Sequence, residues 1–382
     1  MQQECTINLY KKPSRKSGVE LFKIFGILLV VISHVVQTLG TEFEGYTYTH
    51  DLTANTTNPT YLFLALLRYS GALGNSIFFI CSAWFLLDSS KTNKQKILRM
   101  LSDIWIISIL WLVVSLSIPG IDVTNEMLWK SFIPTLAQNN WYTTTYIIFC
   151  FFYPLLNIII KNCDQKKLFT ISLSFFLTYI LIVCFGGFQL ASNLTLWIAI
   201  YFVIAYFKLY GLNICRSFKI NLILLTIGLV GNICMLLGAN ILGYIFPALA
   251  NGLQVGSGNA NFFHLLIAFS GLNLSLQMKF SSKFINYISS LSLLVYVIHE
   301  NIIFRGIYRP IAWQWIYDNL GYNNILLWTL LYVILLFISS ILLATLYKFI
   351  LQKPIHFLSD YAYKLFTKIG NFFANWIYKF KN

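Results

Sequence analysis

The feature that most constrains this chain is a series of long apolar runs. Each is close to the roughly 20 residues that a helix needs to cross the hydrocarbon core of a bilayer. In lipid, backbone polar groups must be satisfied within the segment, so such runs fold as helices. The sequence therefore predicts an all-α, polytopic membrane helix bundle of about ten transmembrane helices. The predicted spans are residues 18–39, 61–87, 101–118, 142–160, 168–188, 194–210, 220–240, 262–278, 284–304 and 325–349.

Composition supports this class and argues against others. The 382 residues are 58% hydrophobic and only 10% charged, which is typical of a multi-pass membrane protein. The formal net charge of +14 does not indicate a nucleic-acid partner, because the cations gather between the apolar runs. The seven cysteines are scattered and form no CxxC pair, so we predict neither a metal site nor a disulfide framework.

The charge of the connecting segments alternates along the chain. Cations are frequent before the first span and after each even-numbered span, whereas the other loops contain little beyond Lys130, Arg305 and Arg309. Cytoplasmic loops carry such an excess of Lys and Arg, so both termini are predicted to be cytoplasmic. We expect residues 1–349 to form the membrane domain. Residues 350–382 would form a cytoplasmic tail, an amphipathic helix that lies on the inner leaflet.

The first span contains three charged or titratable residues, Glu20, Lys23 and His34. Such residues are costly within a membrane and usually face the protein interior or a wet cavity. With 3.6 residues per turn, Lys23 and His34 lie within roughly 20° of one helix face and about 16 Å apart. One helix thus directs a cation and an imidazole into the same interior, and Glu20 is expected to hold Lys23. The alternative is a topogenic lysine and a core histidine.

Other cations have both functional and structural interpretations. Lys96 and Arg99, at the cytoplasmic end of the third span, share a helix face and could bind phosphate together. They could equally be ordinary cytoplasmic charge, with Arg99 paired to Asp103. Arg68, inside the second span, requires a partner, which the acidic first outer loop or Glu300 could supply.

Five motifs follow one another along the chain. They are Lys23 with His34, the FFICSAWF segment around Ser82, Lys96 with Arg99, Trp141-Tyr142 followed by YPLLN, and SSLS followed by Tyr296 and His299. In this order and on this topology they resemble the integral-membrane acyltransferases of the acyltransferase-3 family. That family O-acylates bacterial surface polysaccharides and related acceptors.

The resemblance implies a multi-pass enzyme of the bacterial cytoplasmic membrane. It would move an acyl group, expected to be acetyl, from acetyl-CoA or another acyl-CoA to a hydroxyl of a cell-surface polysaccharide or its lipid-linked precursor. His34 would be catalytic, as a general base or a transient acyl acceptor, and no metal is implied. The CoA phosphates would be bound by Lys23, Lys96 and Arg99. Supporting or acceptor-side roles would fall to Glu20, Arg68, Ser82, Trp141, Tyr142 and His299. The implied partners are acyl-CoA, a carbohydrate acceptor and membrane lipid.

The chain also departs from the pattern of that family. Lysine stands at Lys23 and Lys96 where arginine is more usual, and Ala83 stands where glycine is usual. No extracellular hydrolase-like domain is expected, so the chain would acylate its acceptor directly or pass the acyl group to a separate extracytoplasmic partner. Two alternatives are a non-catalytic membrane component and a flippase, transporter or polymerase for lipid-linked polysaccharide. The latter class would more naturally show inverted repeats.

Overall fold

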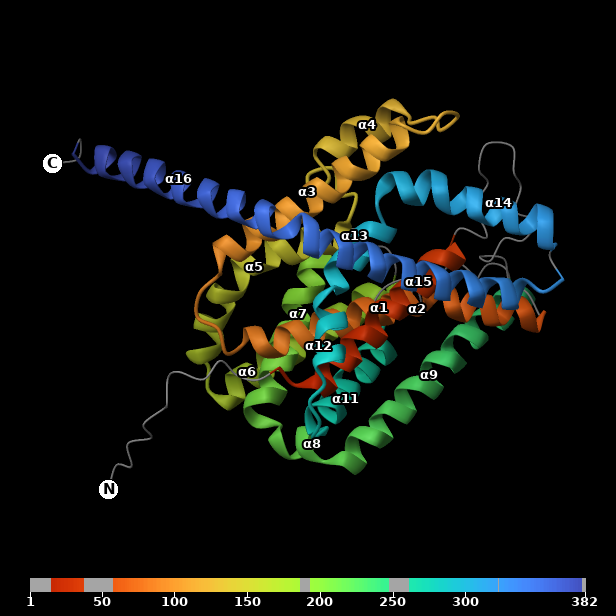
Figure 1. Cartoon of the computed structure of the whole chain (residues 1–382). Helices are drawn as coiled ribbons and strands as arrows, with labels where there is room; N and C mark the ends of the chain where they lie inside the picture. Colours follow the sequence, from red (N-terminus) through yellow and green to blue (C-terminus); the bar gives the residue numbers. More distant parts are fainter. Residues whose placement is uncertain (1–14, 38–57, 186–192, 247–260, 322, 380–382) are drawn as a thin grey trace, which may run out of the picture.

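The computed structural model describes residues 15–37, 58–185, 193–246, 261–321 and 323–379, and these ranges contain helices and no strand (Figure 1). The elements are α1 (Ser17–Gln37), α2 (Pro59–Leu86), α3 (Lys94–Leu116), α4 (Asn125–Phe132), α5 (Trp141–Lys161), α6 (Gln165–Phe185), α7 (Asn193–Tyr210), α8 (Leu212–Arg216), α9 (Phe218–Ile245), α11 (Phe262–Gln277), α12 (Lys283–Ser290), α13 (Ser292–His299), the π-helical turn η2 (Phe304–Tyr308), α14 (Arg309–Leu320), α15 (Ile325–Ile350) and α16 (Gln352–Lys379).

The predicted all-α membrane bundle is confirmed. Within the described part of the chain, seven helices are long and apolar enough to cross a membrane, and a bent pair of helices raises this to eight. Each of the ten predicted spans coincides with helix, although α11 has only 16 residues. The count of ten spans and the cytoplasmic placement of the termini remain predictions.

The predicted ninth span, 284–304, is wrong as a single helix. A turn at Leu291 separates α12 from α13, and the axis bends by 65° between Lys283–His299 and Phe304–Leu320. After the bend, the side chain of Asn301 accepts a 2.9 Å hydrogen bond from the backbone N–H of Ile303. The π-helical turn η2 follows, and such turns are frequent at functional sites. The break leaves Glu300 between two helices.

Close packing of α1 on α2 depends on glycine. A Cβ atom on Gly74 would lie 2.5 Å from the carbonyl oxygen of Gly26, and one on Gly71 would lie 2.6 Å from Oγ of Ser33. Small residues allow membrane helices to approach this closely. Ser33 also donates a hydrogen bond to the carbonyl of Arg68. Gly71 and Gly74 therefore bring α2 into close contact with α1 near Ser33.

Replacing Gly74 with alanine is expected to destabilise the protein by about 1–3 kcal/mol, because the obstructing atom is backbone and cannot rotate away. Gly238→Ala in α9 is the matched control, since a Cβ there meets nothing within 4 Å. Alanine has the higher helix propensity, so this control should be neutral or stabilising. Thermal unfolding of both variants in detergent is the measurement, and equal melting temperatures would contradict the prediction.

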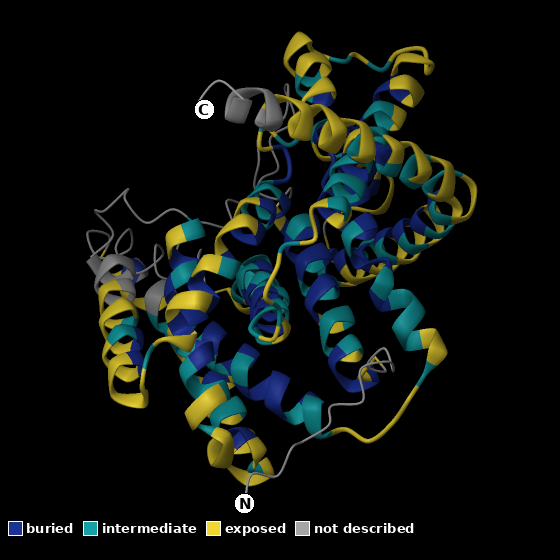
Figure 2. Ribbon diagram, turned by 90° about the vertical axis from the view of Figure 1, so that its left-hand side faces the viewer, coloured by how far each residue is buried: buried dark blue, intermediate teal, exposed yellow. Residues whose placement is uncertain are grey.

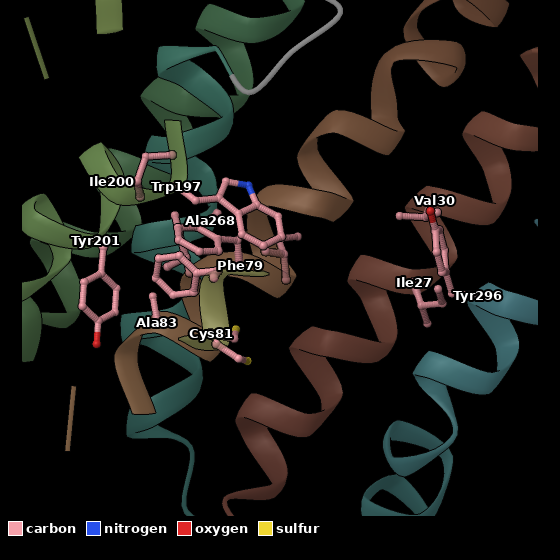
Figure 3. Close-up of a cluster of buried hydrophobic side chains, with 14 of the residues drawn as sticks. Ile27, Val30, Phe79, Cys81, Ala83, Trp197, Ile200, Tyr201, Ala268 and Tyr296 are labelled. Carbon is pink, nitrogen blue, oxygen red and sulfur yellow. The ribbon is translucent and has the colours of Figure 1, made fainter. Parts of the chain in front are cut away.

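The core lies beside this helix pair. The rings of Phe79 and Trp197 stack with centroids 4.4 Å apart, which joins α2 to α7. Figure 3 shows these side chains with Ile200 on one side and Ile27 with Tyr296 on the other. Buried residues occupy the centre of the bundle and exposed ones its periphery (Figure 2). Phe79, Trp197 and Ile200 also line the cavity described below.

Helix α16 extends away from the bundle (Figure 1). Many of its apolar side chains are exposed, among them Phe357, Leu358, Tyr361, Leu365 and Phe372. An exposed apolar face on a helix that also carries lysines suits the membrane interface. Its placement on the inner leaflet remains a prediction.

Candidate active site

The imidazole of His34, in the last turn of α1, contacts two residues from the end of α13. Its Nδ1 lies 2.9 Å from Oε2 of Glu300 and 3.1 Å from Nε2 of His299. His299 is completely buried and Glu300 is 6% exposed. The break after α13 thus brings an imidazole and a carboxylate to a histidine that is distant in sequence.

The hydrogen bonds define the tautomers of both histidines. Nδ1 of His299 lies 2.6 Å from the carbonyl oxygen of Val295. A carbonyl only accepts, so Nδ1 donates, and Nε2 of neutral His299 holds a lone pair. Nδ1 of His34 therefore faces acceptors on both His299 and Glu300, and in neutral His34 it carries the proton. Nε2 of His34 is left with the lone pair, the form required of a general base or a nucleophile.

The carboxylate of Glu300 is also bound by two arginines. Nη2 of Arg309 lies 2.9 Å from Oε2, and Nη1 of Arg305 lies 3.2 Å from Oε1. A carboxylate so deeply buried needs such partners to offset its lost hydration. The carboxylate that faces His34 is therefore fixed on both of its oxygens.

Arg309 and its neighbour Trp313 also fix the end of α1. The guanidinium of Arg309 donates to the carbonyls of His34, at 3.2 Å, and His299, at 2.6 Å. The indole of Trp313 donates to the carbonyl of Val35 at 3.0 Å. Carbonyls in the last turn of a helix need partners of this kind. Helix α14 thereby holds the His34 turn in place.

Among the described residues, His34, His299 and Glu300 also have ligand atoms close enough together to hold a metal ion. Ligand atoms of His34, His299 and Glu300 lie within 4.8 Å of one another. However, Oε2 of Glu300 already accepts from both Arg309 and His34. A cation at that point would face a guanidinium, which repels it. The donor set fits a hydrogen-bonded proton network better than a metal centre.

His34 and Glu300 line a cavity of about 500 Å³. Charged residues on its wall also include Arg68 from α2 and Arg305 from η2. The rest of the lining mixes amide side chains with aromatic rings. It includes Gln37, Asn75, Asn193, Tyr69, Trp141 and Trp197. This volume and mixture are typical of a small-molecule site.

The predicted acceptor-side residues are only partly gathered here. Arg68 and Trp141 line the cavity, and His299 contacts His34. Tyr142 lies behind the wall, where its ring packs edge-on to Trp197 at 4.9 Å. Ser82 does not line the cavity.

The predicted donor-side residues lie away from the cavity lining. Nζ of Lys23 is 3.7 Å from Oε1 of Glu20, and Glu20 accepts a hydrogen bond from Ser289. The expected contact between Glu20 and Lys23 is therefore present. Lys96 is exposed at the start of α3. None of these residues is among those that line the cavity with His34.

The predicted pairing of Arg99 with Asp103 is wrong. Nε of Arg99 lies 2.7 Å from Oδ1 of Asp360 in α16, and its Nη2 contacts Oδ2. Asp103 instead accepts from Tyr347 at 2.9 Å and lies 3.0 Å from Nε2 of His356. The hydrogen bond from Arg99 lowers the pKa of the Asp360 carboxyl to about 2. The pair therefore persists at neutral pH and is lost only in strong acid.

Sequence reasoning missed the main partner of His34. It considered Glu300 as a partner for Arg68, but the described contacts of Glu300 are with His34, Arg305 and Arg309. The available signal was a His-Glu dipeptide at the end of an apolar run. Two arginines within the next nine residues were a second signal of a charged site there.

Comparison with known proteins places almost all of the helix bundle in one family. Residues 16–345 match the acyltransferase-3 family model, described as "Acyltransferase domain". The match begins just before α1, includes the His34 site and ends within α15. No curated protein and no solved structure matches the chain.

Proposed function

Because the chain belongs to the acyltransferase-3 family, we propose that it is a membrane O-acyltransferase that uses cytoplasmic acyl-CoA. In this proposal it transfers an acyl group, acetyl in the simplest case, to a hydroxyl of a cell-surface polysaccharide or its lipid-linked precursor. The observation that carries the proposal is the contact between His34 and Glu300 at the wall of a polar cavity.

The His34 tautomer suits acyl transfer to a hydroxyl. As the acceptor oxygen attacks the thioester carbonyl, Nε2 of His34 takes the hydroxyl proton, and it then gives this proton to the departing CoA sulfur. Glu300 accepts a hydrogen bond from the Nδ1–H group of His34 and stabilises the imidazolium that forms, as the carboxylate of a catalytic triad does. Alternatively, Nε2 attacks the thioester carbonyl carbon, the C–S bond breaks, and CoA departs as the thiolate. The acceptor hydroxyl then attacks the acyl-imidazole, the C–N bond breaks, and the hydroxyl proton ends on the CoA sulfur. Both routes require the same arrangement.

For the donor, we propose that Lys23, Lys96 and Arg99 contact the CoA phosphates on the cytoplasmic side. Hydrogen bonds between cations and phosphate are stronger than neutral ones. Lys96 is exposed and can reach a ligand directly, whereas Arg99 would share its guanidinium with Asp360. The thioester would then point toward His34.

The proposed function is tested with radiolabelled acetyl-CoA added to inverted membrane vesicles. Vesicles that contain the protein are compared with vesicles from cells that lack it. Label in carbohydrate only when the protein is present would support the proposal. Absence of both label transfer and acetyl-CoA binding would overturn it.

The donor site makes a separate prediction. Lys96→Ala and Arg99→Ala are each expected to raise the KM for acyl-CoA about tenfold, since each removes a charge-assisted contact worth about 1.5–3 kcal/mol. Asp360→Asn is the matched control, because it removes the ion pair between α3 and α16 but leaves Arg99 charged. It should leave this KM unchanged or lower it. An equal rise in KM for Arg99→Ala and Asp360→Asn would assign Arg99 to the docking of α16 instead.

A further inference from the structure

We propose that the cavity beside His34 binds an anionic acceptor saccharide, and that Arg68 and Arg305 contact its carboxylate or phosphate group. The inference rests on the proposed function, because it names the class of molecule that the transferase acylates. It follows from the charge balance of the cavity, from the contacts of each arginine and from the remainder of the lining.

The cavity has more positive than negative charge on its wall. Arg68 and Arg305 line it, and within the described residues Glu300 is the one carboxylate that does so. The charge of Glu300 is already balanced by the fully buried Arg309, 2.9 Å from Oε2. The two lining arginines are therefore an excess of positive charge next to the base.

Arg68 is the less satisfied of the two. Its side chain makes no hydrogen bond or ion pair with any residue that the structure describes, although it is partly buried in α2. A guanidinium cannot shed its charge, and a membrane cation of this kind marks a ligand site or path. Its backbone is held by Ser33 on α1. The turn of α2 that carries this cation is therefore anchored to α1 at the cavity wall.

Arg305 is the more exposed of the two arginines that contact Glu300. Its side chain is 44% exposed, and its contact with the carboxylate is 3.2 Å long. The Arg309 side chain is 2% exposed and its contact is 2.9 Å long. Arg305 can therefore turn toward an incoming anion while Arg309 keeps Glu300 in place. Two guanidinium groups would then converge on the ligand, and their planar forks match carboxylate and phosphate oxygens.

The rest of the lining suits a sugar ring. Trp141 and Trp197 offer broad faces that combine apolar area with a polar edge. Asn75 and Asn193 offer amide groups that can both donate to and accept from hydroxyls. An apolar alcohol would leave these amides unpaired, and a neutral sugar would leave Arg68 without a counter-charge. An anion-bearing saccharide uses all three kinds of group.

The test compares acceptors that differ only in charge. The protein in nanodiscs is given acetyl-CoA with neutral galactose oligomers, with galacturonic acid oligomers or with phosphorylated galactose oligomers. We expect kcat/KM for at least one anionic series to exceed that for the neutral series about tenfold or more, because hydrogen bonds to charged groups are stronger than those to neutral groups. The two anionic series separate carboxylate from phosphate recognition.

Substitutions of the two arginines test whether they cause the preference for anionic acceptors. Arg68→Ala and Arg305→Gln should each reduce the ratio of anionic to neutral kcat/KM about tenfold, and Arg68→Lys should recover part of it. Arg216→Ala, in α8 and outside the cavity, should leave the ratio unchanged.

Equilibrium binding of the same oligomers gives a readout independent of chemistry and of variant expression. Equal use and equal binding of neutral and anionic oligomers would overturn the inference while leaving the proposed function intact. Binding of anionic oligomers without transfer of the acetyl group to any acceptor would overturn the proposed function instead.

Discussion

Replacing His34 with alanine is expected to reduce acyl transfer by at least about 10²-fold, the usual contribution of a general base. Nε2 of His34 holds the lone pair that would remove the acceptor proton, and the one carboxylate described on the cavity wall, that of Glu300, is already bound to Arg305 and Arg309. The measurement is transfer of radiolabelled acetyl from acetyl-CoA in inverted vesicles, at matched amounts of inserted protein.

Two other histidines provide controls for this experiment. His356→Ala removes a histidine that contacts Asp103, away from the cavity, and should leave transfer near the wild-type rate. His299→Ala removes one hydrogen-bond acceptor for the Nδ1–H group of His34 but leaves Glu300. We therefore expect a loss of transfer activity between those of His356→Ala and His34→Ala. If His34→Ala retained wild-type transfer, the assignment of His34 as the catalytic residue would be wrong.

The sequence predicted the helices because their signal is local. A run of about 20 apolar residues identifies a span without reference to any other part of the chain. The unusual first helix could be identified for the same reason, since Lys23 and His34 are intrinsically costly in a membrane. These features depend on single segments and not on which segments meet.

The partners of the charged residues could not be predicted in this way. Arg99 has Asp103 one turn away on its own helix, yet its ion pair is with Asp360, 261 residues later. The choice depends on where α16 crosses α3, because Asp103 is occupied by Tyr347 and His356 there. A sequence window contains no information about this crossing.

The helix break within residues 284–304 could not be predicted from amino-acid composition. Residues 284–304 contain neither glycine nor proline, so the apolar run was interpreted as one helix. The bend after His299 is stabilised by long-range contacts of Arg309 with Glu300 and with the carbonyls of His34 and His299. These contacts hold Glu300 beside His34. The site therefore depends on tertiary contacts that outweigh the local preference for a continuous helix.

Replacing Glu300 with glutamine is expected to reduce kcat about 10²-fold or more while changing the KM for acyl-CoA little. Glu300 is a positioning residue: it holds the Nδ1 proton of His34 and stabilises the imidazolium formed during transfer. Glutamine keeps the shape of the side chain and removes its charge. The substitution also leaves Arg309 buried without its counter-charge, which costs about 3–5 kcal/mol when one partner of a buried pair is removed. Kinetics and thermal unfolding must therefore be measured on the same preparation.

The double variant Glu300→Gln with Arg309→Gln separates the two effects. It removes both buried charges, so the melting temperature should recover toward wild type, because replacing a whole buried pair costs far less than breaking it. Transfer should stay low, since the carboxylate beside His34 is still missing. Recovery of both stability and transfer would show that Glu300 serves only to neutralise Arg309, and His34 would then act without a carboxylate partner. Recovery of stability alone would establish that the buried carboxylate acts on the reaction through the His34 imidazole.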